Sequence, residues 1–143
     1  MERTDDMGRF TVKVVVSNNS DRHLAAAGVL APEKVRKVVL EGVVDSGATN
    51  LVLPAKAAKA LGLPVTAWAS VRYADQRQAK RHLVDDAHVE LLGREGTFHA
   101  LVEPRRKTAL LGAIVLEVLD LLVDCTTQKL RPRDPRGIVA EIE

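Results

Sequence analysis

Aromatic residues are scarce in this sequence of 143 residues: one Trp, one Tyr and two Phe make up 3% of it. Because so few large rings are present, Val, Leu and Ala must fill the interior. The hydrophobic fraction of 46% and the charged fraction of 28% are typical of a soluble globular protein. A chain of this length can bury one sizeable core, so we expect a single domain over 1–143.

The sequence also has only one cysteine, Cys125, which excludes an intrachain disulfide and fits a reducing compartment. The polar, acidic start is not followed by an apolar stretch of the signal-peptide kind. The longest apolar region, 109–123, is interrupted by Glu117 and Asp120 and is too short to span a bilayer. We therefore expect a cytoplasmic protein, with Cys125 buried at the end of an apolar run.

Strong charge of one sign is absent as well, since the net charge is only +2. This value gives no indication of a nucleic-acid or membrane partner, and the basic clusters at 80–81 and 105–107 are expected to be solvated faces. The histidines His82, His88 and His99 fall in predicted strands without the spacing of a zinc site. No Gly-rich phosphate loop is present. We predict no cofactor and no metal ion.

An apolar strand runs directly into Asp45-Ser46-Gly47. A carboxylate at the end of a buried strand is costly unless hydrogen bonds or charged partners hold it, so this position needs a reason. The Ser46 hydroxyl can supply hydrogen bonds, and Gly47 lets the backbone turn sharply. These three residues are also ordinary turn formers, so a simple strand-ending turn is the alternative interpretation.

Alternating apolar residues and turn signals predict a mainly β chain with one or two short helices, closed into a barrel-like domain. Strands are expected at 10–16, 35–44, 65–73, 78–84, 88–92, 97–102, 121–125 and 138–142, and helices at 54–61 and 113–119. Residues 17–21 are predicted to form a turn and 93–96 a hairpin loop. For 23–30, a short helix and a strand both remain open.

A second segment, Leu110-Leu111-Gly112, stands just before the second predicted helix. Between it and the Asp-Ser-Gly segment, residues 50–64 contain Leu-Pro, a short helical stretch and Leu-Gly-Leu-Pro. In this order and spacing the chain resembles the retropepsin-like (retroviral-type) aspartic proteases, in particular single-domain bacterial members, over 35–133. The resemblance implies the closed β-barrel-like acid-protease fold.

The resemblance also implies roles for individual residues. Asp45 would be the catalytic aspartate, and its loop would be completed by Ser46, Gly47, Ala48 and Thr49. Residues 71–77 stand where the family has its flap, with Tyr73, Ala74 and Asp75 near the substrate. For Tyr73, packing on the substrate and a place as an exposed strand aromatic both remain open. Leu110, Leu111 and Gly112 would support the catalytic loop. The implied activity is that of an aspartic endopeptidase acting on extended peptide with apolar residues flanking the cut.

This chemistry needs two carboxylates around one water molecule, one ionised as general base and one protonated. The sequence has a single Asp-Ser-Gly, and Asp85-Asp86, Asp120 and Asp124 lack the Ser-Gly that builds the loop. The second carboxylate must therefore come from a second copy across a twofold axis. A homodimer is a requirement of the protease hypothesis.

The sequence departs from the retroviral pattern at two places. Thr49 and Ala113 stand where those proteases carry an Asp and an Arg that form an ion pair. Both partners are missing together, so no buried charge is left alone, and we interpret this as a variant subfamily. The flap segment 74–77 contains no Gly, whereas retroviral flap tips are Gly-rich.

Two other functions remain open. The chain could be a non-catalytic dimer of this fold that binds an extended peptide as an added strand, or that scaffolds a partner. The intact Asp45-Ser46-Gly47 argues against it, because a pure binder needs no adjoining pair of carboxylates. The chain could also be a dormant enzyme that awaits activation.

Overall fold

A computed structural model describes residues 9–143 of the chain. Its strands are β1 Arg9–Asn18, β2 Lys37–Asp45, β3 Leu51–Pro54, β4 Val65–Arg72, β5 Gln78–Leu91, β6 Arg94–Glu103, β7 Ala109–Leu111, β8 Leu121–Asp124 and β9 Lys129–Pro132. Its helices are α1 Asn19–Ala26, α2 Ala55–Leu61, α3 Ala113–Val118 and the short 3₁₀ helix η2 Pro32–Lys34.

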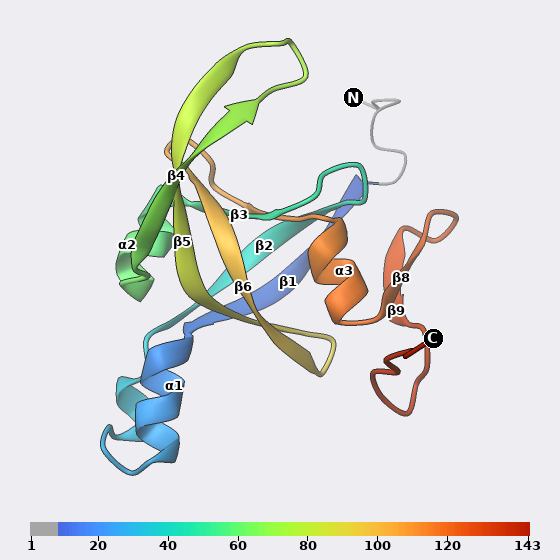
Figure 1. The fold of residues 1–143 in the computed structure, drawn as a ribbon. Helices are drawn as coiled ribbons and strands as arrows, with labels where there is room; N and C mark the ends of the chain where they lie inside the picture. Colours follow the sequence, from blue (N-terminus) through green and yellow to red (C-terminus); the bar gives the residue numbers. More distant parts are fainter. Residues whose placement is uncertain (1–8) are drawn as a thin grey trace.

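Seven strands form one sheet in the order β1-β2-β7-β3-β6-β5-β4 (Figure 1). The end of β1 also pairs with β5, so the first six strands of this order close into a barrel and β4 remains outside it. Closure removes the exposed sheet edges that an open sheet would present. The expected mainly β, barrel-like architecture with short helices is confirmed.

The buried core consists almost entirely of aliphatic side chains. Its largest fully buried residues are Leu51, Leu53, Leu61, Leu111, Leu119, Val14, Val16, Val44, Val84, Val89 and Val115. Phe98 is the one aromatic residue of the buried core within 9–143. The core therefore consists mainly of Val, Leu and Ala, as the scarcity of aromatic residues predicted.

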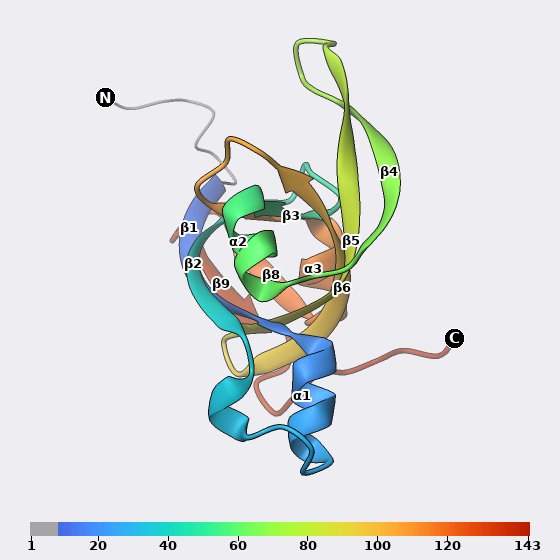
Figure 2. The same ribbon diagram turned by 90° about the vertical axis from the view of Figure 1, so that its left-hand side faces the viewer.

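The β4–β5 hairpin projects beyond the barrel at its upper end in both views (Figures 1 and 2). The two strands expected at 78–84 and 88–92 are joined in β5, which is irregular between Val84 and Ala87. The next hairpin turns over only Leu92 and Gly93, both with positive φ, as a two-residue type I′ turn requires. The hairpin loop predicted at 93–96 is therefore wrong in its bounds, because the turn spans only 92–93.

The turn expected at 17–21 is wrong, because β1 continues through Asn18 and α1 begins directly after it. The Asn18 side-chain oxygen accepts a hydrogen bond from the Asp21 backbone N–H at 2.9 Å, which caps the helix. Its Nδ2 donates to the Leu61 carbonyl at 2.8 Å. Asn18, a residue type typical of turns, serves here as a helix cap. The segment 23–30, for which a helix and a strand both remained open, is helical through Ala26.

The C-terminal part differs from expectation at two points. Residues 138–142 form no strand, and Cys125 is exposed rather than buried. Cys125 lies in the turn between β8 and β9, where the Asp124 carboxylate accepts the backbone N–H groups of Thr126 and Thr127. A local polar turn therefore ends the apolar run before the cysteine. Within 9–143 no helix is long and apolar enough to cross a membrane.

Candidate active site

Asp45 is the last residue of β2, which lies between β1 and β7. The preceding residue, Val44, is fully buried, pairs with Phe10 of β1 and runs parallel to Leu111 of β7. The Asp45 side chain itself retains 20% of its exposure. The strand therefore carries a carboxylate from the core to the surface. Strand β2 ends at the upper end of the barrel, from which the β4–β5 hairpin projects (Figure 1).

The backbone after Asp45 folds back on its carboxylate. Oδ1 accepts a hydrogen bond from the Gly47 backbone N–H at 3.0 Å, and the Asp45 carbonyl accepts the Ala48 N–H at 3.1 Å. Ser46 and Gly47 are exposed, as is Thr49, while Ala48 is half-buried. The turn leaves the carboxylate accessible and fixes its orientation by a backbone donor.

The start of α3 holds the other end of this loop. The backbone N–H of Ala113 donates to the Ala48 carbonyl at 2.8 Å, and that of Ile114 donates to the Thr49 carbonyl at 3.0 Å. The first N–H groups of a helix have no partners within the helix, and here the loop supplies them. The loop and α3 therefore satisfy each other's backbone groups.

Strand β7 supports the loop from the barrel wall. It runs parallel to β2 and antiparallel to β3, so it lies between the strand that enters the loop and the strand that leaves it. Leu110 and Leu111 are both buried, and Gly112 passes directly against the backbone of Thr49 and Asn50. The structure thus brings the predicted supporting segment and the predicted loop together.

A guanidinium that the sequence analysis did not single out also contacts Asp45. Arg9 is the register partner of Asp45 across β1 and β2, and its Nη2 lies 3.2 Å from Oδ2 of that residue. The contact depends on the pairing register of two distant strands. No local pattern in the sequence could have identified it.

The flap-like turn 73–77 closes with hydrogen bonds from Tyr73 N–H to the Arg77 carbonyl and from Gln76 N–H to the Tyr73 carbonyl, both 2.9 Å. Gln76 has a φ of 72°, a left-handed conformation that glycine adopts most readily. Ala74 and Asp75 are exposed at the tip. The hydrogen bond and charge of Arg77 hold the pKa of Asp75 below its usual range.

Tyr73 does not project freely, because its hydroxyl donates to Oε2 of Glu103 at the end of β6. Arg81 of β5 donates from Nε to the other carboxylate oxygen at 3.0 Å. The bond to the Glu103 carboxylate raises the pKa of Tyr73. This three-residue network anchors the flap-like turn to the barrel, a link that the sequence analysis missed.

The loop between β6 and β7 lies at the same upper end of the barrel in both views (Figures 1 and 2). On it, Arg106 is half-buried and donates to the carbonyl and hydroxyl oxygens of Thr108. Burial lowers the pKa of Arg106, and the charges of Glu103, Arg9 and Asp45 act on it as well. Arg106 is therefore close enough to Asp45 for the two charges to interact.

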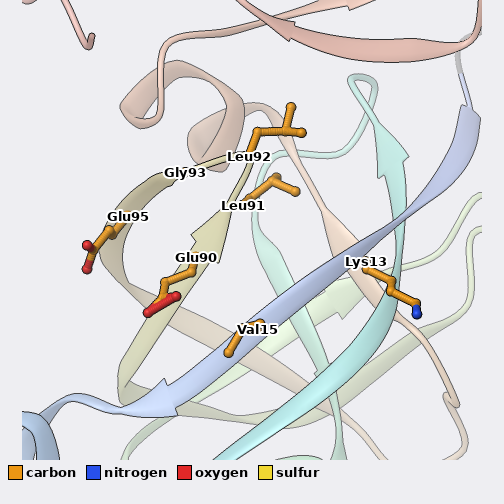
Figure 3. A pocket seen from close by; sticks show the side chains of 7 residues that line it. All are labelled: Lys13, Val15, Glu90, Leu91, Leu92, Gly93 and Glu95. Carbon is orange, nitrogen blue, oxygen red and sulfur yellow. The ribbon is translucent and has the colours of Figure 1, made fainter.

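The one metal-like cluster within 9–143 lies elsewhere, on the β5–β6 hairpin, where ligand atoms of His88, Glu90 and Glu95 fall within 4.8 Å of one another. Figure 3 shows Glu90 and Glu95 at the rim of a nearby cavity of about 280 Å³, with Lys13 of β1 also lining it. The buried His88 ring is already bonded through Nε2 to Glu95 at 2.7 Å and through Nδ1 to Thr97 at 3.0 Å. The Arg22 guanidinium also contacts Glu95 at 3.3 Å, so these side chains already form a hydrogen-bond network among themselves.

Comparison with known protein families gives a match over the part of the chain that contains this site. Residues 31–115 match the family described as aspartyl protease, a match that includes the Asp45 loop, the flap-like hairpin and β7. None of the curated proteins matches the sequence.

The fold is similar to that of a solved retroviral protease, the EIAV protease complexed with the inhibitor HBY-793. The two chains share 17% sequence identity with a TM-score of 0.52, over 78% of this chain and 88% of the other. At this identity the likeness concerns the fold, and it confirms the acid-protease type of barrel that the sequence predicted.

Proposed function

Because this chain belongs to the aspartyl protease family, we propose that it is a homodimeric aspartic endopeptidase with Asp45 of each chain in its catalytic pair. The observation that carries the proposal is the position of Asp45 at the end of a strand from the core. The loop that follows turns back so that the Gly47 N–H donates a hydrogen bond to Oδ1 of Asp45. An ordinary surface turn would need neither the α3 N-terminus nor β7 behind it.

The proposed chemistry follows from two carboxyl groups that share one proton. The ionised Asp45 takes a proton from a water molecule, whose oxygen attacks the carbonyl carbon of the scissile peptide bond. The protonated Asp45 of the other chain donates a hydrogen bond to the carbonyl oxygen and stabilises the developing charge. Proton transfer to the peptide nitrogen then allows the C–N bond to break, giving a carboxylic acid and an amine.

The dimer is part of this proposal because each chain has a single Asp-Ser-Gly. A twofold axis beside the loop would bring two Asp45 side chains together, and Ser46, exposed in the single chain, would bond across to the partner's loop. Gly47 would leave its backbone open to substrate, with Ala48 and Thr49 completing the loop.

Residues 71–77 are proposed to act as the flap over an extended peptide or protein substrate. Closure of such a hairpin excludes bulk water and strengthens the electrostatic interactions in the site. The Tyr73–Glu103 bond would fix the base of this flap, while Ala74 and Asp75 at its exposed tip would approach the substrate. We also propose a cytoplasmic location and no cofactor.

The experiment that tests the function is cleavage of a peptide library, read by mass spectrometry between about pH 4 and 7, where a carboxylate pair of this kind operates. Wild type is expected to cut, and Asp45→Asn to lose all cuts while remaining folded. Asp86→Asn is the matched control, because Asp86 has a φ of 67°, which Asn tolerates, and contacts Ser20 of α1.

Cuts that persist in Asp45→Asn would contradict the aspartic mechanism. A folded, dimeric wild type that binds peptides without cutting any would favour the non-catalytic binding dimer instead. Loss of activity in Asp86→Asn as well would mean that the assay reports folding rather than chemistry.

A further inference from the structure

A cavity of about 550 Å³ opens between the flap-like turn and the β6–β7 loop. Its lining residues are Tyr73, Arg77, Arg81, Glu103, Pro104 and Arg105. A volume in this range is typical of sites that accommodate a small ligand or part of a larger one. The proposed function does not account for this cavity.

Positive charges outnumber negative ones around the cavity, because three arginines and one carboxylate line it. Glu103 is engaged by Tyr73 and Arg81, and Arg77 forms an ion pair with Asp75 at 2.7 Å. Arg105 is exposed and has no ion pair within the part of the chain that the structure describes. The lining therefore has an excess positive charge, and Arg105 is the guanidinium available to a ligand.

The cavity is also lined by the loop that leads into β7, the strand that pairs with β2 just before Asp45. Arg106, next to Arg105 on the same loop, interacts electrostatically with Asp45. Strand β7, which begins just after this loop, runs parallel to β2 along the residues that lead to Asp45. The turn 73–77, which would close over bound peptide, forms the opposite wall. Under the proposed function, we expect a peptide held at Asp45 beneath this turn to extend past the cavity.

We propose that this cavity is a specificity site that accepts an Asp or Glu side chain of the substrate, with Arg105 as the residue that recognises it. The inference rests on the proposed function and adds an acidic residue to the apolar ones expected around the cut. A guanidinium presents two parallel N–H donors to a carboxylate, which an amide side chain of the same shape cannot match. In a twofold dimer the cavity occurs on each side of the catalytic pair, so the preference is expected at two positions flanking the cut.

The test compares cleavage of one peptide library by wild type, Arg105→Glu and Lys107→Glu. Lys107 is the matched control, since it lies on the same loop and carries the same charge but does not line this cavity. Wild type is expected to favour Asp or Glu over Asn or Gln about tenfold at the flanking positions, a discrimination that corresponds to one charge-assisted hydrogen bond. Arg105→Glu should invert the preference toward Lys or Arg, and Lys107→Glu should preserve it.

Binding provides a second readout that does not depend on turnover. Immobilised Asp45→Asn is incubated with the same library, and the retained peptides are identified by mass spectrometry, with and without the added Arg105→Glu change. Enrichment of acidic peptides only when Arg105 is present supports the inference, even if no variant cuts.

The failures can be told apart. Asp45-dependent cutting without an acidic preference would overturn the specificity site and leave the protease function standing. Equal effects of Arg105→Glu and Lys107→Glu would overturn it too, because they would reflect general charge attraction. Neither cutting nor acidic enrichment would overturn both proposals.

Discussion

Gly112 passes so close to Asn50 that a Cβ on Gly112 would lie 2.5 Å from the Asn50 backbone oxygen. The same Cβ would lie 2.6 Å from the backbone carbon of Thr49. Backbone atoms cannot move aside as a flexible side chain can, and Gly112 has an ordinary φ of −85°, so the requirement for glycine is one of space. The close approach allows the first N–H groups of α3 to reach the Asp45 loop.

We predict that Gly112→Ala displaces the Asp45 loop and removes peptide cleavage. The expected loss of stability is about 2 kcal/mol, as for overpacking of a well-packed interior, measured by urea unfolding. Gly42→Ala is the control: its Cβ would meet the Leu111 side chain at 3.1 Å, which can adjust. We expect a smaller loss there, with activity retained. A Gly112→Ala protein as active as wild type would contradict this account of the loop.

The parts of the site that depend on local sequence could be predicted from it. Asp45 at a strand end and Gly112 before a helix are recognisable because the residue types and their spacing are themselves the signal. The barrel follows from alternating aliphatic residues and regular turns. The aspartyl protease family match and the acid-protease fold confirm the predicted family and the predicted barrel.

The parts that depend on long-range register could not be predicted. Arg9 reaches Asp45 only because β1 and β2 pair in one particular register, and Glu103 meets Tyr73 only once the β4–β5 hairpin folds over the end of β6. Asn18 could equally have formed a turn, since the same side chain serves turns and helix caps. The contacts made in the folded chain decide among these local options.

A second prediction concerns acid stability and the Asp21–Arg36 pair. Asp21 is buried and accepts hydrogen bonds from Arg36 Nε at 2.8 Å, Nη2 at 3.0 Å and the backbone N–H at 3.0 Å. The side-chain bond from Arg36 is the main reason that the pKa of Asp21 lies below its usual value. A folded-state pKa below the unfolded one means that ionised Asp21 stabilises the fold above about pH 4 and loses this contribution as the pH falls further.

Asp21→Asn should therefore lower the free energy of unfolding at pH 7, and the difference from wild type should narrow below about pH 4. Urea unfolding at several pH values measures this. Asp75→Asn serves as control because Asp75 and its partner Arg77 are both exposed, so their ion pair should contribute little at any pH. A pH-independent difference for Asp21→Asn would show that its charge is not the cause.

A third prediction concerns Arg94, which ties the C-terminal segment to the barrel. Its buried guanidinium donates to the carbonyls of Leu119 and Asp120, at 3.1 and 2.9 Å, and to that of Asp134. Arg94→Met would leave these acceptors without their donor, at a cost of about 2 kcal/mol. Arg133→Met should cost less in urea unfolding, because Arg133 is 40% exposed although it also binds Asp120. Equal losses would contradict the role assigned to burial.

The last prediction tests whether the catalytic pair is shared between two chains. Wild type and Asp45→Asn are mixed in equal amounts and allowed to exchange subunits, and the initial rate of peptide cleavage is measured. If a dimer needs Asp45 from both chains, only about a quarter of the dimers are active, because random pairing squares the wild-type fraction. Independent monomers would instead give about half the activity of an all-wild-type sample. Activity that follows the square of the wild-type fraction over several mixing ratios supports the shared site. A linear dependence would require a second carboxylate within one chain, for which the sequence offers no second Asp-Ser-Gly.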